Sequence, residues 1–503
     1  MVLRIAEAFA SRFFPTHYLI HIGVSVFSLL VLRALSQGRK TDRERDLHAR
    51  IILVTGGFTP LGLTLLQSLA QRGAHVIALS QDAIDSSKVT ILIDLLRTTT
   101  SNEQIYAEEC DLSSPSSVRA FCTKFLTGND QRLDAIIFAH EHRHIGSPKI
   151  FSSKAKEQEQ KERDSGSLAT FLITILLLPA LLVAPPERDI RIVNIVNPFY
   201  AAASGLPFAP KFSSSQSTTT LPSNSIFLQE GIRSLRTIVF TRHLQRILDA
   251  LPSAAQVPKT EEGSKTVPVI SEKLQKSNIV AISVSPGISR VDTISSLLLA
   301  DLMSPTGSYL GVFVYLVLQP LLRILTKSPI AAVQSVLHVL FLPTPFKIPS
   351  QTTIASSIKR ADDNTSQAPI GLRASSIAEE MLKPGALYAN CAVVKLDVKI
   401  PTDVMEKDLQ ERKEATLNKS KGKGKENDDK SLQEVLDIKD DGEYGGELAG
   451  RLIWEEYEGA LKIWEQENPG KPEEKKETVQ PPVAQPQPKQ ATVEEEEDED
   501  VYR

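Results

Sequence analysis

The segment that most constrains the fold is an apolar run that ends in a glycine turn and continues at helical spacing. Residues Ile51–Val54 are all apolar, residues 55–62 form a glycine-bearing turn, and residues 63–70 repeat apolar side chains as a helix does. A strand, a tight glycine turn and a helix give the geometry in which helix N-terminal N–H groups bind a dinucleotide pyrophosphate. This segment therefore predicts a strand–turn–helix unit of an α/β fold, in which the turn either binds a dinucleotide or is an ordinary connection between strand and helix; the surrounding sequence decides between them.

The chain repeats this alternation of strand and helix patterns up to about residue 291. We predict an α/β fold with a doubly wound parallel sheet, a Rossmann fold. Residues Pro115–Phe125 indicate an amphipathic helix. The apolar run Leu168–Ala184 comes directly before a strand pattern, and this position favours a buried crossover helix over a second membrane span. The predicted strands are Ile51–Val54, His75–Leu79, Ile105–Ala107, Ala135–Phe138, Arg191–Ile195 and Ile279–Val284.

Composition narrows the class of protein. The chain has 503 residues with a hydrophobic fraction of 41%, which suffices for a sizeable core. Its net charge of −4 gives no reason to expect nucleic acid as a partner. The 3 cysteines are widely spaced and form neither a disulfide framework nor a metal site, so a reducing compartment is favoured.

The N-terminus carries a candidate membrane segment. Residues Tyr18–Leu32 are nearly all apolar and no small-residue cleavage site follows, which favours an uncleaved anchor. An interfacial helix and a soluble packing helix remain alternatives. Basic residues are denser after the segment than before it, so the positive-inside rule predicts that the bulk of the chain faces the cytosol. A later apolar run, Tyr309–Leu325, could lie in a membrane interface or cover a substrate pocket.

Changes of composition divide the chain into five parts. Polar, charged or Ser/Thr-rich stretches at 154–163, 213–225 and 252–273 are interpreted as surface insertions, and the polar stretch 350–376 is expected to be disordered. The basic run 419–425 could contact anionic lipid, although a solvated segment is the favoured interpretation. The predicted parts are an anchor with its basic flank (1–46), a Rossmann domain (47–345), a polar linker (346–383), a C-terminal pocket segment and closing helix (384–466, with a disordered insertion at 407–441) and a disordered acidic tail (467–503).

Five features in order resemble the short-chain dehydrogenase/reductase superfamily, in particular its retinol-dehydrogenase-like branch. Residues 55–62 resemble the cofactor turn Thr-Gly-x-x-x-Gly-x-Gly, and 110–113 resemble the Asp-Leu pair beside adenine. Residues 133–139 are similar to the run before the Asn-Asn-Ala-Gly strand end, and 285–287 match the Pro-Gly turn beside nicotinamide. The C-terminal pieces 388–391 and 452–458 resemble the branch's pocket segment and closing helix.

This resemblance implies NAD or NADP as the cofactor. Pro60 replaces one family glycine, removes a backbone N–H and adds bulk, so we expect weakened binding. Ser80 and Gln81 at the second strand's end carry no charge and Asp82 comes late, so the choice between NAD and NADP stays open. The residues expected to bind the cofactor are Thr55, Gly56, Gly57, Phe58, Leu61, Gly62, Asp111, Leu112, Ala139, Pro286 and Gly287.

The catalytic residues that the resemblance implies are not found. The family uses a Tyr-x-x-x-Lys pair on one helix face, where the ammonium lowers the phenol pKa, and a serine that orients the substrate oxygen. Alignment places Asn197 at the serine position, and Phe227 and Gly231 at the tyrosine and lysine positions. The one tyrosine between residues 111 and 285 is Tyr200, and Ser204 follows it at the lysine spacing.

A histidine-rich run follows the fourth predicted strand. His140, Glu141, His142 and His144 could ligate a metal or act as acid or base, but the spacing is not His-Glu-x-x-His. The favoured interpretation is a solvated loop, and we predict no metal site. The family's structural asparagine falls near Gly166, so it too is missing.

The sequence therefore leaves three hypotheses. The first is a degenerate member, a pseudoenzyme that binds a dinucleotide or lipid. The second is an active oxidoreductase on a lipophilic alcohol or ketone that uses Asn197, Tyr200 or His140 instead. The third is a protein that shapes or tethers membranes. The expected partners are membrane lipid at the N-terminal helix, a lipophilic small molecule and a second copy in a homodimer, at the endoplasmic reticulum or another lipid-associated membrane.

Overall fold

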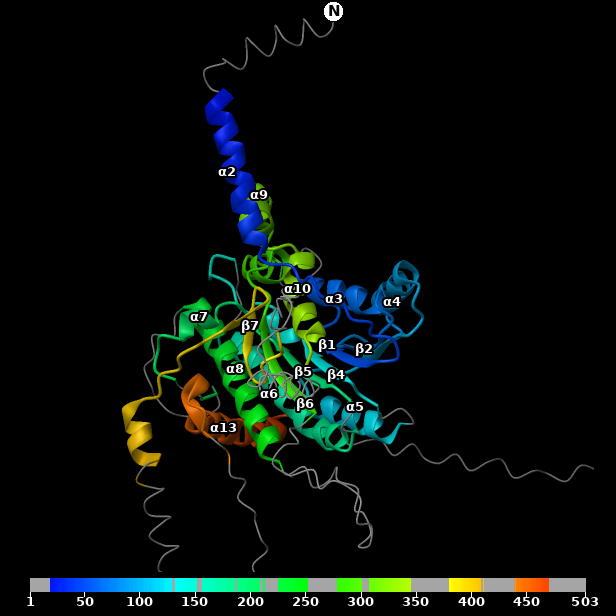
Figure 1. Ribbon diagram of the computed structural model, residues 1–503, viewed down its shortest axis with the longest axis vertical. Helices are drawn as coiled ribbons and strands as arrows, with labels where there is room; N and C mark the ends of the chain where they lie inside the picture. Colours follow the sequence, from blue (N-terminus) through cyan, green and yellow to red (C-terminus); the bar gives the residue numbers. More distant parts are fainter. Residues whose placement is uncertain are drawn as a thin grey trace, which may run out of the picture. The chain divides into compact units, whose positions relative to one another are not determined.

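The centre of the molecule is an eight-stranded sheet with helices on both faces (Figure 1). The computed structural model describes residues 19–128, 132–151, 156–185, 188–208, 211–212, 225–251, 278–300, 307–344, 380–408, 410, 438 and 440–469. The strand order is β3-β2-β1-β4-β5-β6-β7-β8. Strands β1 to β7 are parallel, and β8 is antiparallel to β7. The order reverses direction between β1 and β4, which confirms the predicted doubly wound Rossmann fold.

All six predicted strands are present, with bounds within two residues of those expected. Two further strands, β7 and β8, extend the sheet and were not predicted, because a run of three residues is too short to give a strand pattern. The bounds are β1 Ile51–Thr55, β2 His75–Ser80, β3 Ile105–Glu109, β4 Ala135–Phe138, β5 Ile190–Ile195, β6 Ile279–Ser285, β7 Leu387–Ala389 and β8 Ala392–Val394.

Alternate residues of the central strands point to two separate cores. Leu53 and Ile136 face the core under α5, α6, α8 and α13, whereas Ile52 and Ile137 face the core under α3, α4 and α10. The α-helices are α2 Leu19–Gln37, α3 Pro60–Ala70, α4 Ser87–Thr100, α5 Pro115–Thr127, α6 Lys156–Leu182, the single turn α7 Tyr200–Ala203, α8 Ile226–Ala250, α9 Tyr309–Leu325, α10 Pro329–Phe341 and α13 Gly446–Glu467. Short helical turns are η2 His140–His142, η5 Arg290–Ser295 and η7 Glu443–Gly445.

Helix α6 confirms the predicted crossover helix and corrects one neighbouring prediction. Its apolar half is buried, as Phe171 illustrates. The charged stretch before it, which the sequence suggested to be a surface insertion, belongs to the same helix from Lys156 onward. Arg163 in that stretch is completely buried, because Glu230 of α8 pairs with it at 2.6 Å between Nε and Oε1. The ion pair with Glu230, which is distant in sequence, therefore allows Arg163 to be buried, whereas the composition of the stretch predicted exposure to solvent.

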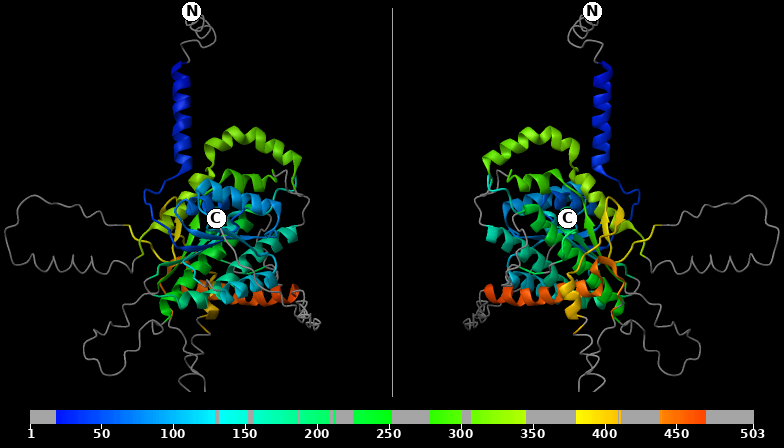
Figure 2. Two further views of the ribbon diagram at one scale, coloured as in Figure 1. Left: turned by 90° about the vertical axis from the view of Figure 1, so that its right-hand side faces the viewer. Right: turned by 90° about the vertical axis from the view of Figure 1, so that its left-hand side faces the viewer.

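Helix α2 is one of two helices in the described residues that are long and apolar enough to cross a membrane; the other is α6. Its side chains from Ile20 to Leu35 are exposed, with Phe27 exposed by 68%. The end of α2 lies beside α9 (Figure 1), where the Ser36 hydroxyl donates to the Ile324 carbonyl at 2.5 Å. Two views turned by 90° show α2 and the arched α9 on the same side of the sheet (Figure 2).

The C-terminal pieces of the chain complete the domain. Residues 388–391, expected in a pocket segment, lie in the β7–β8 hairpin at the edge of the sheet, where Tyr388 is buried. The expected closing helix is α13, whose Tyr457 stacks on Phe171 with ring centroids 5.0 Å apart. Most of the predicted linker 346–383, most of the insertion 407–441 and the tail from residue 470 lie outside the described residues.

Candidate functional site

The residues expected to bind a cofactor meet at one edge of the sheet. Strands β1, β3, β4 and β6 end at Thr55, Glu109, Phe138 and Ser285, and parallel pairing brings these ends to the same side. The glycine turn, the Asp111–Leu112 pair, Ala139 and the Pro286–Gly287 turn follow these ends directly. In doubly wound sheets a ligand binds at this carboxyl edge, where the strand order reverses. The structure therefore assembles the candidate site at the place where the fold puts ligands.

The first turn is fixed by His140. The Thr55 hydroxyl lies 2.7 Å from His140 Nδ1, and His140 Nε2 lies 3.0 Å from the Gly166 carbonyl. Since a carbonyl only accepts, Nε2 carries the proton and Thr55 donates to Nδ1. Gly56 adopts a φ of +67°, and a Cβ there would lie 2.7 Å from the His140 backbone, so only glycine fits. His140 thus links the turn after β1 to helix α6.

The amides at the start of α3 are already occupied. Pro60 has no N–H, and the Gly62 amide donates to the Thr59 hydroxyl at 3.1 Å. The Leu61 amide donates to the Asp292 carboxylate at 3.2 Å. A helix N-terminus attracts anions through these N–H groups and the helix dipole. In this chain the anion is a side chain of the protein itself.

Asp292 is held firmly in this position. It lies in η5, is 2% exposed, and its Oδ2 accepts from the Ser289 hydroxyl at 3.2 Å. Sequence reasoning missed Asp292, because nothing local distinguishes it from a surface aspartate five residues after a Pro-Gly turn. Around it, Lys327 Nζ donates to the Pro286 carbonyl at 2.7 Å. Burial lowers the pKa of Lys327.

Asp111, which was expected beside adenine, forms hydrogen bonds with neighbouring residues of the protein. Its carboxylate accepts from the Ser113 amide at 2.9 Å and from the Gln81 side chain at 3.2 Å. Leu112 packs partly buried against the core under α5 and α6. These contacts keep the loop after β3 in place beside the end of β2 and leave the carboxylate partly accessible.

Asn197 lies at the position expected for the catalytic serine, and its side chain forms hydrogen bonds with backbone groups. Its Nδ2 donates to the His142 carbonyl at 3.1 Å, and its Oδ1 accepts from the Phe199 amide at 3.1 Å. The residue is completely buried. Both ends of the side chain therefore hold the loop after β4 to the end of β5, so neither end points to a substrate oxygen in this arrangement.

Phe227 and Gly231 lie one turn apart on α8, as expected. A Cβ at Gly231 would lie 2.5 Å from the Phe199 carbonyl oxygen, so α8 approaches α7 too closely for any side chain. Phe227 packs on Phe199, with ring centroids 4.8 Å apart, and lies 6.1 Å from the ring of His144. The two positions thus form packing contacts, and the whole of α8 contains neither tyrosine nor lysine.

The residues proposed as substitutes are not poised for proton transfer either. Burial raises the pKa of Tyr200, which is the opposite of what a phenol acting near neutral pH requires. Both ring nitrogens of His140 are engaged, as described above, and burial lowers its pKa.

The histidine-rich run corrects a second prediction, because it is not a solvated loop. Glu141, His142 and His144 are buried. Arg233 of α8 covers them by donating to the Glu141 carbonyl at 2.5 Å. Desolvation lowers the pKa of His142 and lowers the pKa of His144 to about 4, so both are neutral at neutral pH. Within the described residues, no group of three or more His, Cys, Asp or Glu is arranged to hold a metal ion.

A buried network of charges closes the face of α8 beside this run. Glu230 pairs with Arg163 at 2.6 Å and with Arg233 at 2.8 Å, and all three side chains are almost wholly buried. The i, i+3 spacing of Glu230 and Arg233 was the one local signal for this network.

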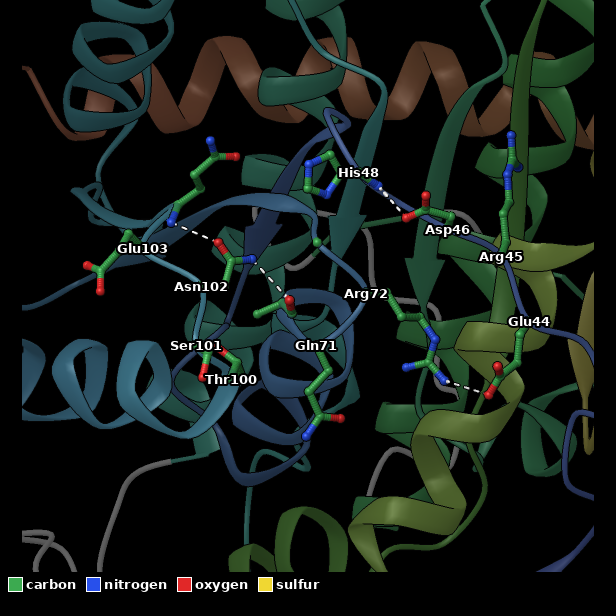
Figure 3. A pocket seen from close by; sticks show the side chains of 13 residues that line it. Glu44, Arg45, Asp46, His48, Gln71, Arg72, Thr100, Ser101, Asn102 and Glu103 are labelled. Atoms are coloured by element: carbon green, nitrogen blue, oxygen red, sulfur yellow. Dashed lines mark hydrogen bonds and ion pairs between the residues drawn. The ribbon is translucent and has the colours of Figure 1, made fainter.

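A separate polar cavity lies at the opposite edge of the sheet (Figure 3). It has a volume of about 770 Å³ and is lined by the residues before β1 and those between α3 and β2 and between α4 and β3. Its polar groups pair with each other: Asn102 Nδ2 donates to the Ala70 carbonyl at 3.0 Å, and Arg72 lies 3.9 Å from Glu44. Ligands of this fold bind at the other edge, so this cavity is not the cofactor site.

The strand order and the turns at the carboxyl edge define a protein with the Rossmann fold. A KR domain model matches residues 51–146. The chain is 25% identical over 321 residues to the uncharacterized oxidoreductase pbr1 of Schizosaccharomyces pombe, covering 64% of this chain and 77% of that protein. It is 28% identical over 327 residues to the uncharacterized oxidoreductase YNL181W of Saccharomyces cerevisiae, covering 61% and 71% respectively.

The match extends to retinol dehydrogenases. Human retinol dehydrogenase 11 is 29% identical over 167 residues, which cover 33% of this chain and 49% of that enzyme. These matches support the predicted resemblance to the short-chain dehydrogenase/reductase superfamily and to its retinol-dehydrogenase-like branch. The resemblance predicted from five separate motifs is thereby confirmed.

Proposed function

We propose that this chain is a membrane-anchored protein of the short-chain dehydrogenase/reductase type that binds a dinucleotide or a lipid. We propose further that it does not carry out hydride transfer through the family's proton relay. The observation that carries this proposal is the close approach at Gly231. A lysine there would place its Cβ 2.5 Å from the Phe199 carbonyl, so the ammonium that lowers a catalytic phenol pKa has no place. Asn197, bonded at both ends to backbone groups, supports the same conclusion.

Family membership implies a nicotinamide dinucleotide, and the residues present fit it poorly. A pyrophosphate needs free helical amides, but Leu61 donates to Asp292, Gly62 donates to Thr59, and Pro60 has no N–H. Asp292 also places a negative charge where the pyrophosphate charge would lie. We therefore propose that NAD or NADP binds weakly, through the residues of the carboxyl edge, and only when Asp292 moves away.

The membrane location rests on α2 and its flank. The helix is exposed, apolar and followed by Arg39, Lys40 and Arg43. A bilayer removes the exposed apolar surface from water, and basic residues favour the cytosolic side. We propose that α2 anchors the chain at the endoplasmic reticulum or another lipid-associated membrane with the domain in the cytosol. A lipophilic small molecule and a homodimer remain predictions of the resemblance.

The test uses the full-length protein in detergent. NADH and NADPH are titrated by isothermal calorimetry, and hydride transfer to a panel of lipophilic ketones and aldehydes is followed by absorbance. We expect weak dinucleotide binding and no transfer above the blank. Transfer that is abolished by Tyr200→Phe or by His140→Gln would overturn the proposal and establish the second hypothesis. Extraction of membranes with alkaline carbonate tests the anchor separately, and release of the protein would contradict it.

A further inference from the structure

A small cavity at the base of α2 is lined by arginines. It has a volume of about 320 Å³ and lies between the end of α2, the turn η5 and the end of α9. Arginine comes from each of these three elements, and hydroxyl and amide side chains complete the lining. The lining residues are Arg33, Gln37, Arg290, Arg323, Thr326 and Ser328.

The cavity has positive charge without a counter-charge. No carboxylate lines it, and within the described residues none of the three guanidinium groups forms an ion pair or a side-chain hydrogen bond. Arg290 is half-buried, whereas Arg33 and Arg323 are exposed at the mouth of the cavity. The fully buried arginines elsewhere, Arg163, Arg191 and Arg246, each pair with a carboxylate. Three guanidinium groups that converge on one small cavity repel each other until an anion joins them. The charge pattern therefore indicates an anionic ligand.

Hydrogen bonds between the elements fix the frame of this cavity. The Gln37 side chain donates to the Thr326 carbonyl at 3.0 Å and accepts from the Ser328 amide at 3.2 Å. The Arg290 amide donates to the Lys327 carbonyl at 3.3 Å. The end of α2, the end of α9 and the start of η5 are thus joined through a single stretch, 326–328. The arginines project from a defined frame and not from independent loops.

The two helices that contribute arginines to the cavity also carry exposed apolar side chains. On α9, Tyr309, Phe313 and Leu316 are exposed by 85%, 65% and 64%, and their spacing puts them on one helix face. On α2, Phe27 and Leu30 are exposed by 68% and 61%. A free phosphate would leave this apolar surface of α2 and α9 exposed to water, whereas the acyl chains of a lipid would cover it. The apolar surroundings therefore select a lipid as the source of the anion.

From this geometry we propose that the cavity binds the phosphate of an anionic lipid headgroup while the apolar faces of α2 and α9 lie in the same leaflet. Planar guanidinium groups bind phosphate oxygens in a bidentate manner, and Thr326 and Ser328 lie beside them as further polar groups. This inference rests on the membrane location proposed above. It adds a specific headgroup site that would orient the domain on the bilayer and does not depend on any dinucleotide.

The test measures lipid retention by the full-length protein. Protein stripped of lipid in detergent is mixed with equal amounts of dioleoyl phosphatidic acid and dioleoyl phosphatidylcholine, and native mass spectrometry counts the lipids retained. We expect the wild type to retain phosphatidic acid preferentially. The pair Arg290→Gln/Arg323→Gln should lower that retention about tenfold or more, because each basic contact to an anionic membrane surface contributes appreciably, and should leave phosphatidylcholine unchanged.

The matched control removes the same charge outside the cavity. Arg39→Gln/Lys40→Gln alters two exposed basic residues of the same flank and should leave the preference intact. Equal losses in both pairs would mean unspecific surface charge, and no loss in either would mean no site; both results overturn the proposal. Displacement of phosphatidic acid by excess inorganic phosphate would overturn the lipid source. Failure of carbonate-resistant anchoring is a separate result, because retention is measured in detergent.

Discussion

The Asp292 carboxylate accepts a hydrogen bond from the Leu61 amide at 3.2 Å, at the N-terminus of the helix where this fold holds a pyrophosphate. The chain thus supplies an anion of its own to the cofactor turn. We expect this arrangement to compete with a dinucleotide, because the carboxylate lies where the fold would hold the pyrophosphate. Pro60, which precedes Leu61, reduces the number of free amides in the same turn.

Removal of this carboxylate should strengthen dinucleotide binding. Asp292→Ala frees the Leu61 amide and removes a charge that repels the pyrophosphate, so we expect NADPH to bind about tenfold more tightly by isothermal calorimetry. The control is Ser289→Ala, which removes a hydroxyl donor to Asp292 and leaves its charge. Equal affinities for Asp292→Ala and wild type would show that the carboxylate does not compete with the cofactor.

Gly231 should not tolerate even a methyl group. Gly231→Ala forces α7 and α8 apart at the Phe199 carbonyl, and we expect a loss of about 1–3 kcal/mol in the free energy of unfolding. Gly459 of α13 has no atom within 4 Å of an added Cβ, so Gly459→Ala should stabilise the protein by about 0.5–1 kcal/mol. Urea denaturation measures both. Similar changes for the two variants would contradict the close approach of the helices.

Glu230 should be essential to the stability of the core. Glu230→Gln leaves Arg163 and Arg233 buried without their shared anion, and breaking a buried pair costs about 3–5 kcal/mol. The control is Glu465→Gln, which removes a solvent-exposed partner of Arg119 and should change stability by less than about 1 kcal/mol. A small effect at Glu230 in urea denaturation would mean that the arginines find other partners.

His144 should make the folded state sensitive to acid. Its pKa is lowered to about 4, first by desolvation and then by Arg233 and Arg163, against a raising effect of Glu230. Below the ordinary pKa of about 6.5 the unfolded state binds a proton that the folded state refuses. The stability contributed by neutral His144 is therefore complete above pH 6.5 and is lost as pH falls toward 4.

The measurement is urea denaturation between pH 7 and pH 4. His144→Phe, which can pack with Phe199 and Phe227, should flatten the decline in stability by about 2–3 kcal/mol. Phe227→Leu alters the same packing without changing a titrating group, so its profile should keep the wild-type slope. A His144→Phe profile parallel to the wild type would show that the acid sensitivity has another origin.

The carboxyl-edge residues could be predicted because their signals are local. Thr55 and Gly56 follow an apolar strand run, and the Pro286–Gly287 turn follows another, so topology brought them together. The hairpin of β7 and β8 was missed because its strands have three residues each. The burial of Arg163 and of His144 was also missed, since each depends on side chains of α8 that no local pattern connects to it.

The sequence by itself predicted six of the eight strands, the family resemblance and the absence of a Tyr-x-x-x-Lys pair from α8, because hydrophobic periodicity, glycine turns and residue types are all readable along the chain. Only the tertiary structure decided what the remaining positions do. Asp292 and Leu61 are separated by 231 residues, and the arginines of the cavity come from three elements. Contacts between such distant segments depend on how the helices pack over the sheet, and packing leaves no periodic signal in the sequence.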